Sequence, residues 1–236
     1  MSDFAPAVNA DNPEPRIAVA LLLDTSWSMN GAPIAALNDG YKAFCEAIDA
    51  DPLARKRTEV TVITFGGTAD VAVPFMEGRD LAAMAFHPNG GTPLGGALDL
   101  ALDEIAARKQ QYKDLGLSYY RPWLFVITDG GPTDGATFER AVGRVRAAED
   151  AKQVTVFGVG VEGADMPTLG RICSPQRPPL PLRGTAFREL FLWLSASMSV
   201  VSQSGGHGAS DAKLATAEEG VQAPLPAPSG WTTWTT

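Results

Sequence analysis

The apolar run Ile17-Ala18-Val19-Ala20-Leu21-Leu22-Leu23 leads directly into the polar stretch Asp24-Thr25-Ser26-Trp27-Ser28. An unbroken apolar run of this length predicts a β-strand covered on both faces, as in a parallel sheet. The carboxylate of Asp24 and the hydroxyl groups of Ser26 and Ser28 are hard oxygen ligands at the end of that strand. They suit a cation of the magnesium type better than covalent chemistry.

Strand and helix patterns alternate from residue 16 to about residue 202. This order predicts an α/β fold with three layers: a doubly wound, mostly parallel, six-stranded sheet between helices. A Gly-rich turn of three residues joins the second strand to the third, so the third is expected as an antiparallel edge strand. The expected strands are 17–23, 59–65, 69–75, 123–128, 154–159 and one around 182–186, and the expected helices are 33–49, 94–105, 138–148, 166–172 and 187–201.

The length and composition predict one domain with short extensions. The chain has 236 residues, of which 45% are hydrophobic, and this is enough for one sizeable core. We expect a flexible leader at residues 1–15, the domain at 16–202, and a flexible tail at 203–236 that is rich in Gly, Ser and Pro. Cys45 is expected in the core, and Cys173 has no nearby Cys or His with which to form a zinc site.

The charge of the chain argues against two classes of partner. The formal net charge is -8, and the sequence shows no basic stripe or basic tail. Nucleic acid and anionic membrane surfaces are therefore unexpected as partners. The N-terminus lacks the pattern of a secretion signal, and no apolar stretch is long enough to span a bilayer. We therefore expect a cytoplasmic protein.

Two later segments add ligands of the same kind. Thr92 lies in a Gly-rich loop at residues 90–96, and Asp129 ends the strand at 123–128. Each residue also has an ordinary structural interpretation, since Thr92 before a proline suits a helix N-cap and Asp129 before a glycine suits a turn. The occurrence of all five oxygen ligands in loops beside regular elements favours a single cation site. Its members are Asp24, Ser26, Ser28, Thr92 and Asp129.

These residues carry a resemblance to a known family. Asp24, Ser26 and Ser28, then Thr92, then Asp129 match in order the metal-ion-dependent adhesion site of von Willebrand factor A (vWA) domains. The flanks 28–31, 91–98 and 128–130 resemble the bacterial intracellular TerY-like branch, found with tellurium-resistance and stress genes. Unlike some TerY-like proteins, this chain has no CxxC pairs and hence no zinc ribbon.

The resemblance implies a function. It predicts a non-enzymatic module that binds Mg²⁺ or Mn²⁺ and holds a protein partner through that partner's Asp or Glu. It also implies direct ligation by Ser26, Ser28 and Thr92, with Asp24 and Asp129 acting through water. A Ser/Thr kinase and a PP2C-type phosphatase are expected in the same signalling system.

Aromatic residues mark two candidate contacts for a partner. Trp27 lies between two of the ligands and is expected to be exposed there. The chain ends in Trp231-Thr232-Thr233-Trp234-Thr235-Thr236, which is either a docking peptide or a tail that packs on its own domain. We hypothesise that Thr232, Thr233, Thr235 and Thr236 are phosphoacceptors; mass spectrometry after incubation with the kinase tests this, and unmodified threonines would refute it.

The sequence leaves three alternative functions open. The first is a scaffold subunit of an AAA+ ATPase complex, and the second is a metal-dependent hydrolase that uses Ser26 or Ser28. The hydrolase lacks a convincing base, because His87 lies in a loop and His207 in the tail. The third is dinucleotide binding by the G-x-G-x-x-G pattern at residues 158–163, although no suitable acidic residue follows it.

Overall fold

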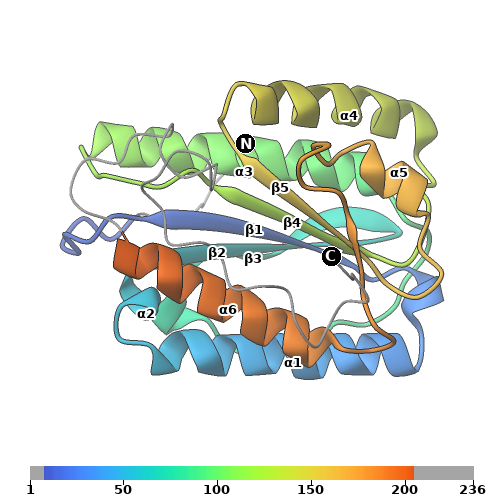
Figure 1. The fold of residues 1–236 in the computed structure, drawn as a ribbon, viewed down its shortest axis with the longest axis horizontal. Coiled ribbons are helices and arrows are strands. Elements are labelled where there is room, and N and C mark those ends of the chain that lie inside the picture. The colour runs from blue at the N-terminus through green and yellow to red at the C-terminus, as the bar shows by residue number, and fades with distance from the viewer. Residues whose placement is uncertain (1–7, 205–236) are drawn as a thin grey trace.

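A computed structural model describes residues 8–204, which form a three-layer α/β domain (Figure 1). The sheet has the strand order β3-β2-β1-β4-β5-β6, and within it only the β2–β3 pair is antiparallel. The predicted fold class and the antiparallel edge strand are therefore confirmed. The strands are β1 Ile17–Asp24, β2 Thr58–Gly66, β3 Thr68–Glu77, β4 Trp123–Thr128, β5 Thr155–Gly160 and β6 Leu180–Pro181.

Helices cover both faces of this sheet (Figure 1). On one face α1 and α6 pack side by side, and on the other face α3, α4 and α5 lie together. Short 3-10 turns cover Trp27–Met29 and Gly78–Asp80. The α-helices are α1 Ala32–Ala50, α2 Ala54–Arg57, α3 Leu94–Asp114, α4 Gly135–Asp150, α5 Met166–Gly170 and α6 Phe187–Ser204.

The burial of the central strand β1 explains the continuous apolar run in the sequence. Every residue of β1 is buried. Side chains alternate between the faces of a strand, so Val19 and Leu21 pack against α1 and α6 while Ala20 and Leu22 pack against α3 and α4. An apolar residue is therefore needed at each position, which produces the continuous apolar run.

The last strand lies earlier than the sequence pattern suggested. We expected a strand around residues 182–186, but β6 consists of Leu180 and Pro181. The amide of Leu182 still donates to the carbonyl of Gly160 over 2.7 Å. Gly184 then adopts a positive φ of 52°, which turns the chain away from the sheet before α6.

Residues 8–15, where we expected part of a flexible leader, pack against the domain. The side chain of Asn12 is buried, and its Nδ2 donates to the carbonyl of Lys56 (2.7 Å) and to Oε1 of Glu77 (3.1 Å). The guanidinium of Arg57 also binds the carboxylate of Glu14. Side-chain hydrogen bonds hold this segment, and such contacts leave no periodic signal in a sequence.

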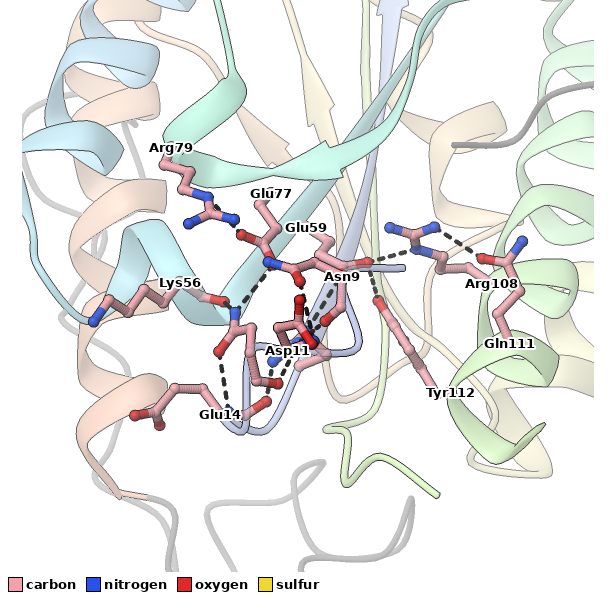
Figure 2. Close-up of polar contacts among 12 residues, drawn as sticks. Asn9, Asp11, Glu14, Lys56, Glu59, Glu77, Arg79, Arg108, Gln111 and Tyr112 are labelled. Atoms are coloured by element: carbon pink, nitrogen blue, oxygen red, sulfur yellow. Dashed lines mark hydrogen bonds and ion pairs between the residues drawn. The ribbon is translucent and has the colours of Figure 1, made fainter. Parts of the chain in front are cut away.

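A buried ionic network joins the N-terminal segment to the sheet and to α3 (Figure 2). The carboxylate of Glu59 accepts from Arg16 through Oε1, and from Arg108 and Tyr112 through Oε2. Arg16 and Glu59 are fully buried, and Arg108 is nearly so. The network lies at the amino ends of β1 and β2, at the opposite end of the sheet from Asp24.

Cys45 and Cys173 are both buried and unbridged, so the predicted core position of Cys45 is confirmed. Within the described part of the chain, no helix is both long enough and apolar enough to cross a membrane.

The Glu59 network predicts a large stability effect. Replacing Glu59 with Ala leaves two buried guanidinium groups without their carboxylate, so the free energy of unfolding is expected to fall by about 3–5 kcal/mol. Urea denaturation measures this change. Glu46 is an exposed carboxylate on α1, and Glu46→Ala serves as the control, with an expected change within about 0.5 kcal/mol. Equal effects of the two substitutions would contradict this account of the network.

Candidate metal centre

Two loops and the end of β1 meet at the carboxyl edge of the sheet. β1 and β4 are neighbours in the sheet although β2 and β3 lie between them in sequence, so the winding of the chain reverses at this point. Ligand sites of open α/β sheets lie at such positions. Backbone bonds join the β1–α1 turn to the loop before α3: Trp27 N donates to Gly90 O (3.0 Å), and Asn89 N donates to Thr25 O (2.7 Å).

Four of the five predicted ligand residues form one chain of hydrogen bonds. The backbone N–H of Ser26 donates to Oδ1 of Asp24 (2.8 Å). The hydroxyl groups of Ser26 and Ser28 are 2.9 Å apart, and Ser28 Oγ donates to Oδ1 of Asp129 (2.7 Å). The chain spans 101 residues of sequence between Ser28 and Asp129, so it depends on the fold and not on local geometry.

The fifth residue, Thr92, faces the same space. Its Oγ1 lies 3.6 Å from the point where a Cβ on Gly130 would stand, and Ser28 Oγ lies 4.0 Å from that point. Thr92 N donates to Thr133 Oγ1 (3.0 Å), and Thr133 N donates to Thr92 O (2.9 Å), so the two loops hold each other. The structure therefore brings the oxygen atoms of all five residues together.

The structure corrects one interpretation of Thr92. We considered its hydroxyl as the N-cap of α3, but the amide of Leu94 donates to the backbone carbonyl of Thr92 and the next two amides bind another side chain. The carboxylate of Asp134 accepts from Gly95 N (3.1 Å) and Gly96 N (2.8 Å). Asp134 thus caps α3 from the loop that follows β4, and the hydroxyl group of Thr92 points to the candidate site instead.

Thr128 is a supporting residue that the sequence analysis missed. It is the last residue of β4, and its hydroxyl donates to Oδ2 of Asp24, which lies at the end of the neighbouring strand. Thr128 Oγ1 also accepts from Gly130 N (3.2 Å). The only available signal was its position directly before Asp129, which does not distinguish it from an ordinary strand residue.

Burial controls the acidity of Asp24. Loss of hydration raises the pKa of this carboxyl above its ordinary value, while hydrogen bonds from Ser26 and Thr128 oppose the rise. Repulsion by Asp129 also raises the pKa of Asp24, but this is the smallest contribution. Burial, and not repulsion between the two carboxylates, is therefore the main cause of the raised pKa of Asp24.

The residues present fit a hard divalent cation. Two carboxylates and three hydroxyl groups are oxygen ligands of the kind that Mg²⁺ and Mn²⁺ prefer. Within residues 8–204, no group of three or more His, Cys, Asp or Glu side chains is arranged to hold a metal ion, so hydroxyl oxygens have to complete any ligand set here. Asp24 is fully buried whereas Ser28 and Trp27 are exposed, so the site opens to solvent on one side.

The glycines of the G-x-G-x-x-G pattern have a packing role in this structure. A Cβ on Gly158 would lie 2.8 Å from Cys173 Sγ, and a Cβ on Gly160 would lie 2.3 Å from Met166 Sδ. Both glycines belong to β5 and allow the segment from α5 to β6 to approach the strand. Close packing therefore accounts for these two glycines without a bound phosphate.

Sequence comparison identifies the family of the chain. The profile described as "von Willebrand factor type A domain" matches residues 18–190. The chain belongs to the von Willebrand factor type A (VWA) domain family. A search of curated protein sequences finds no significant match.

Solved structures with the same fold include other VWA proteins. The vWF domain of the type V pili tip protein Mfa5 from Porphyromonas gingivalis has a TM-score of 0.57 and 12% identity, over 80% of this chain and 95% of that one. Manganese-loaded Plasmodium vivax TRAP protein has a TM-score of 0.51 and 18% identity, over 75% and 73%. Mussel byssus proximal thread matrix protein 1, with a zinc-occupied MIDAS motif, has a TM-score of 0.50 and 16% identity, over 79% and 48%. This VWA domain thus spans about half the length of the mussel protein.

The hydrogen bond from Thr128 to Asp24 gives a testable prediction. Thr128→Val leaves a buried carboxylate oxygen without its donor, so the free energy of unfolding should fall by roughly 1–3 kcal/mol. Thr155→Val is the matched control, because Thr155 Oγ1 is buried with no hydrogen-bond partner among the described residues. Urea denaturation should show no loss of stability, or a small gain, for the control. A larger loss for Thr155→Val than for Thr128→Val would contradict this description of the site.

Proposed function

We propose that this VWA domain is a metal-dependent protein-interaction module. Asp24, Ser26, Ser28, Thr92 and Asp129 would hold Mg²⁺ or Mn²⁺ at the carboxyl edge of the sheet. The ion would supply a positive centre for an Asp or Glu side chain of a protein partner. The observation that carries this proposal is the hydrogen-bonded chain from Asp24 to Asp129, which gathers ligands from separate loops at an edge open to solvent.

The charges of the ligand set support binding of a partner's carboxylate. Asp24 and Asp129 together balance the charge of a divalent cation, and the three hydroxyl groups add none. A set with a third carboxylate would instead repel an incoming acidic side chain. Two structural relatives, one loaded with manganese and one with zinc at a MIDAS motif, support a divalent cation at this place in the fold.

Trp27 supports the choice of a protein as the partner. It lies between the ligands Ser26 and Ser28, and 62% of its surface is exposed. Exposed tryptophan beside a polar site is a typical anchor of protein interfaces. We infer that the partner places apolar surface on Trp27 while its carboxylate approaches the ion. Ser28 follows Trp27 in the chain, is exposed, and donates a hydrogen bond to Asp129. It therefore connects the apolar contact at Trp27 with the proposed ion site.

The proposal also includes the cellular system in which the domain acts. The flanking sequences at 28–31, 91–98 and 128–130 resemble the TerY-like branch, which supports a cytoplasmic role in a bacterial stress or tellurium-resistance system. A Ser/Thr kinase and a PP2C-type phosphatase would then be partners, and the domain itself would have no catalytic activity. Trp231, Trp234 and the threonines proposed as phosphoacceptors lie outside the described residues.

Metal binding is tested by calorimetric titration of Mg²⁺, Mn²⁺ and Zn²⁺. Wild-type protein should bind one Mg²⁺ or Mn²⁺ saturably, and the variant with Asp24→Asn and Asp129→Asn should not. At a free metal concentration of 100 times Kd, binding should raise the free energy of unfolding by about 2.7 kcal/mol. Asp165→Asn is the control, since Asp165 is a carboxylate on the same edge that instead binds Thr168. Equal binding by wild type and the double variant would refute the site.

The role of Trp27 is tested by affinity capture with Mg²⁺ and with EDTA. Trp27→Ala removes the apolar contact but no metal ligand, so calorimetry should find metal affinity within about twofold of wild type. Capture of the metal-dependent partner should fall at least about tenfold, which is typical for loss of an aromatic anchor. Trp193→Phe, a change on α6 away from the edge, should capture as wild type does. Undiminished capture by Trp27→Ala would contradict the assigned contact.

A further inference from the structure

A pocket lies between α3 and α4, away from the candidate metal centre. These helices run side by side on one face of the sheet (Figure 1). The pocket has a volume of about 530 Å³ and is bordered by the second half of α3, the second half of α4 and the turn before β5. This volume falls within the range of pockets that hold small organic ligands. The residues of the metal centre are not among those that line it.

The inner wall of this α3–α4 pocket is apolar. Leu102 and Ile105 from α3 and Val154 before β5 line it and are also part of the buried core. Ala106 and Ala147 form the outer walls, and both are exposed. Because alanine side chains are short, the two helices leave open space above the core at this point. That space suits a flat apolar body.

All charged residues that line the pocket are cationic, and Gln110 and Gln153 complete the polar lining. Lys109 and Lys113 from α3 and Arg144 from α4 line it, and none of the described lining residues is Asp or Glu. This pattern differs from the chain as a whole, whose formal net charge is -8. An anion would therefore meet complementary charge here and repulsion over most of the remaining surface.

The three cations differ in their surroundings. Arg144 binds the carboxylates of Asp99 and Asp103, each over 2.6 Å, so its charge is balanced within the protein. Lys109 is nearly buried, and its Nζ lies 3.3 Å from the carbonyl oxygen of Gln153. Lys113 lies one helical turn beyond Lys109 and is exposed. Both lysines therefore belong to the wall of the pocket that α3 forms.

Lys113 also has a structural role that any test must separate from binding. It occupies the last turn of α3, where a cation stabilises the negative end of the helix. On the same stretch of α3, the side chain of Gln110 donates a hydrogen bond to that of Asp114 over 2.7 Å. Stability and ligand affinity therefore have to be measured on the same variants.

We propose that the α3–α4 pocket binds a small organic acid with a flat apolar body and one carboxylate. The apolar body packs on Leu102, Ile105 and Val154, and the carboxylate binds the ammonium groups of Lys109 and Lys113. The proposal does not depend on metal binding, because the pocket and the metal centre share no residue.

The probe is 1-naphthoate, titrated into the full chain and followed by amide NMR shifts. The largest shifts should fall on the second half of α3 and on Val154, with 1-naphthalenemethanol binding about fivefold more weakly. Lys113→Gln should weaken naphthoate binding about fivefold and leave the alcohol unchanged. Lys42→Gln is the control, since Lys42 is an exposed lysine on α1 at the opposite face of the sheet.

A pair of tryptophan substitutions tests the place of binding. Ala147→Trp should fill the pocket and abolish binding of both probes. Ala107→Trp is the matched control, because Ala107 is exposed on α3 and does not line the pocket. Thermal unfolding of each variant reports on its fold, and the lysine variants decide the matter if Ala147→Trp does not fold. The proposal is overturned if the acid and the alcohol bind with equal affinity, or if the largest amide shifts fall outside the pocket. It is also overturned if Lys113→Gln binds naphthoate as tightly as wild type does.

Discussion

The carboxylate of Asp24 ends a strand that is buried on both faces, and this constrains the whole carboxyl edge of the sheet. A buried carboxylate loses hydration and must be compensated by donors or by a cation. Ser26 N and the Thr128 hydroxyl supply hydrogen bonds, and burial still raises the pKa of Asp24. The protein donors offset only part of this cost, so a cation at the same place would stabilise the ionised form.

The elements that carry the site are anchored at their other ends. β1 begins next to Arg16, and α3 contains Arg108 and Tyr112; all three side chains bind the buried carboxylate of Glu59. The same two elements present Asp24 and, through the loop before α3, Thr92 to the candidate metal centre. The ionic network therefore fixes the positions of β1 and α3 relative to each other, which in turn fixes the distance between ligands from different loops.

Much of the fold and of the site was readable from the sequence, for physical reasons. β1 could be predicted because burial on both faces demands an unbroken apolar run. The convergence of Asp24 and Asp129 could be predicted because residues at the carboxyl ends of neighbouring parallel strands meet at one edge of the sheet. Thr128 and Asp134 could not, since each acts on a residue distant in sequence that no local pattern identifies. The packing of residues 8–15 was missed for the same reason, because the bonds of Asn12 to Lys56 and Glu77 are long-range.

Diffraction from crystals grown with Mn²⁺, measured at a wavelength where manganese scatters anomalously, tests the central claim most directly. The account predicts one strong anomalous peak at the carboxyl edge of the sheet, with oxygen atoms of Ser26, Ser28 and Thr92 as direct ligands and Asp24 and Asp129 bound through water. A peak elsewhere on the protein, or an intact Ser28–Asp129 hydrogen bond and no peak at saturating Mn²⁺, would contradict it.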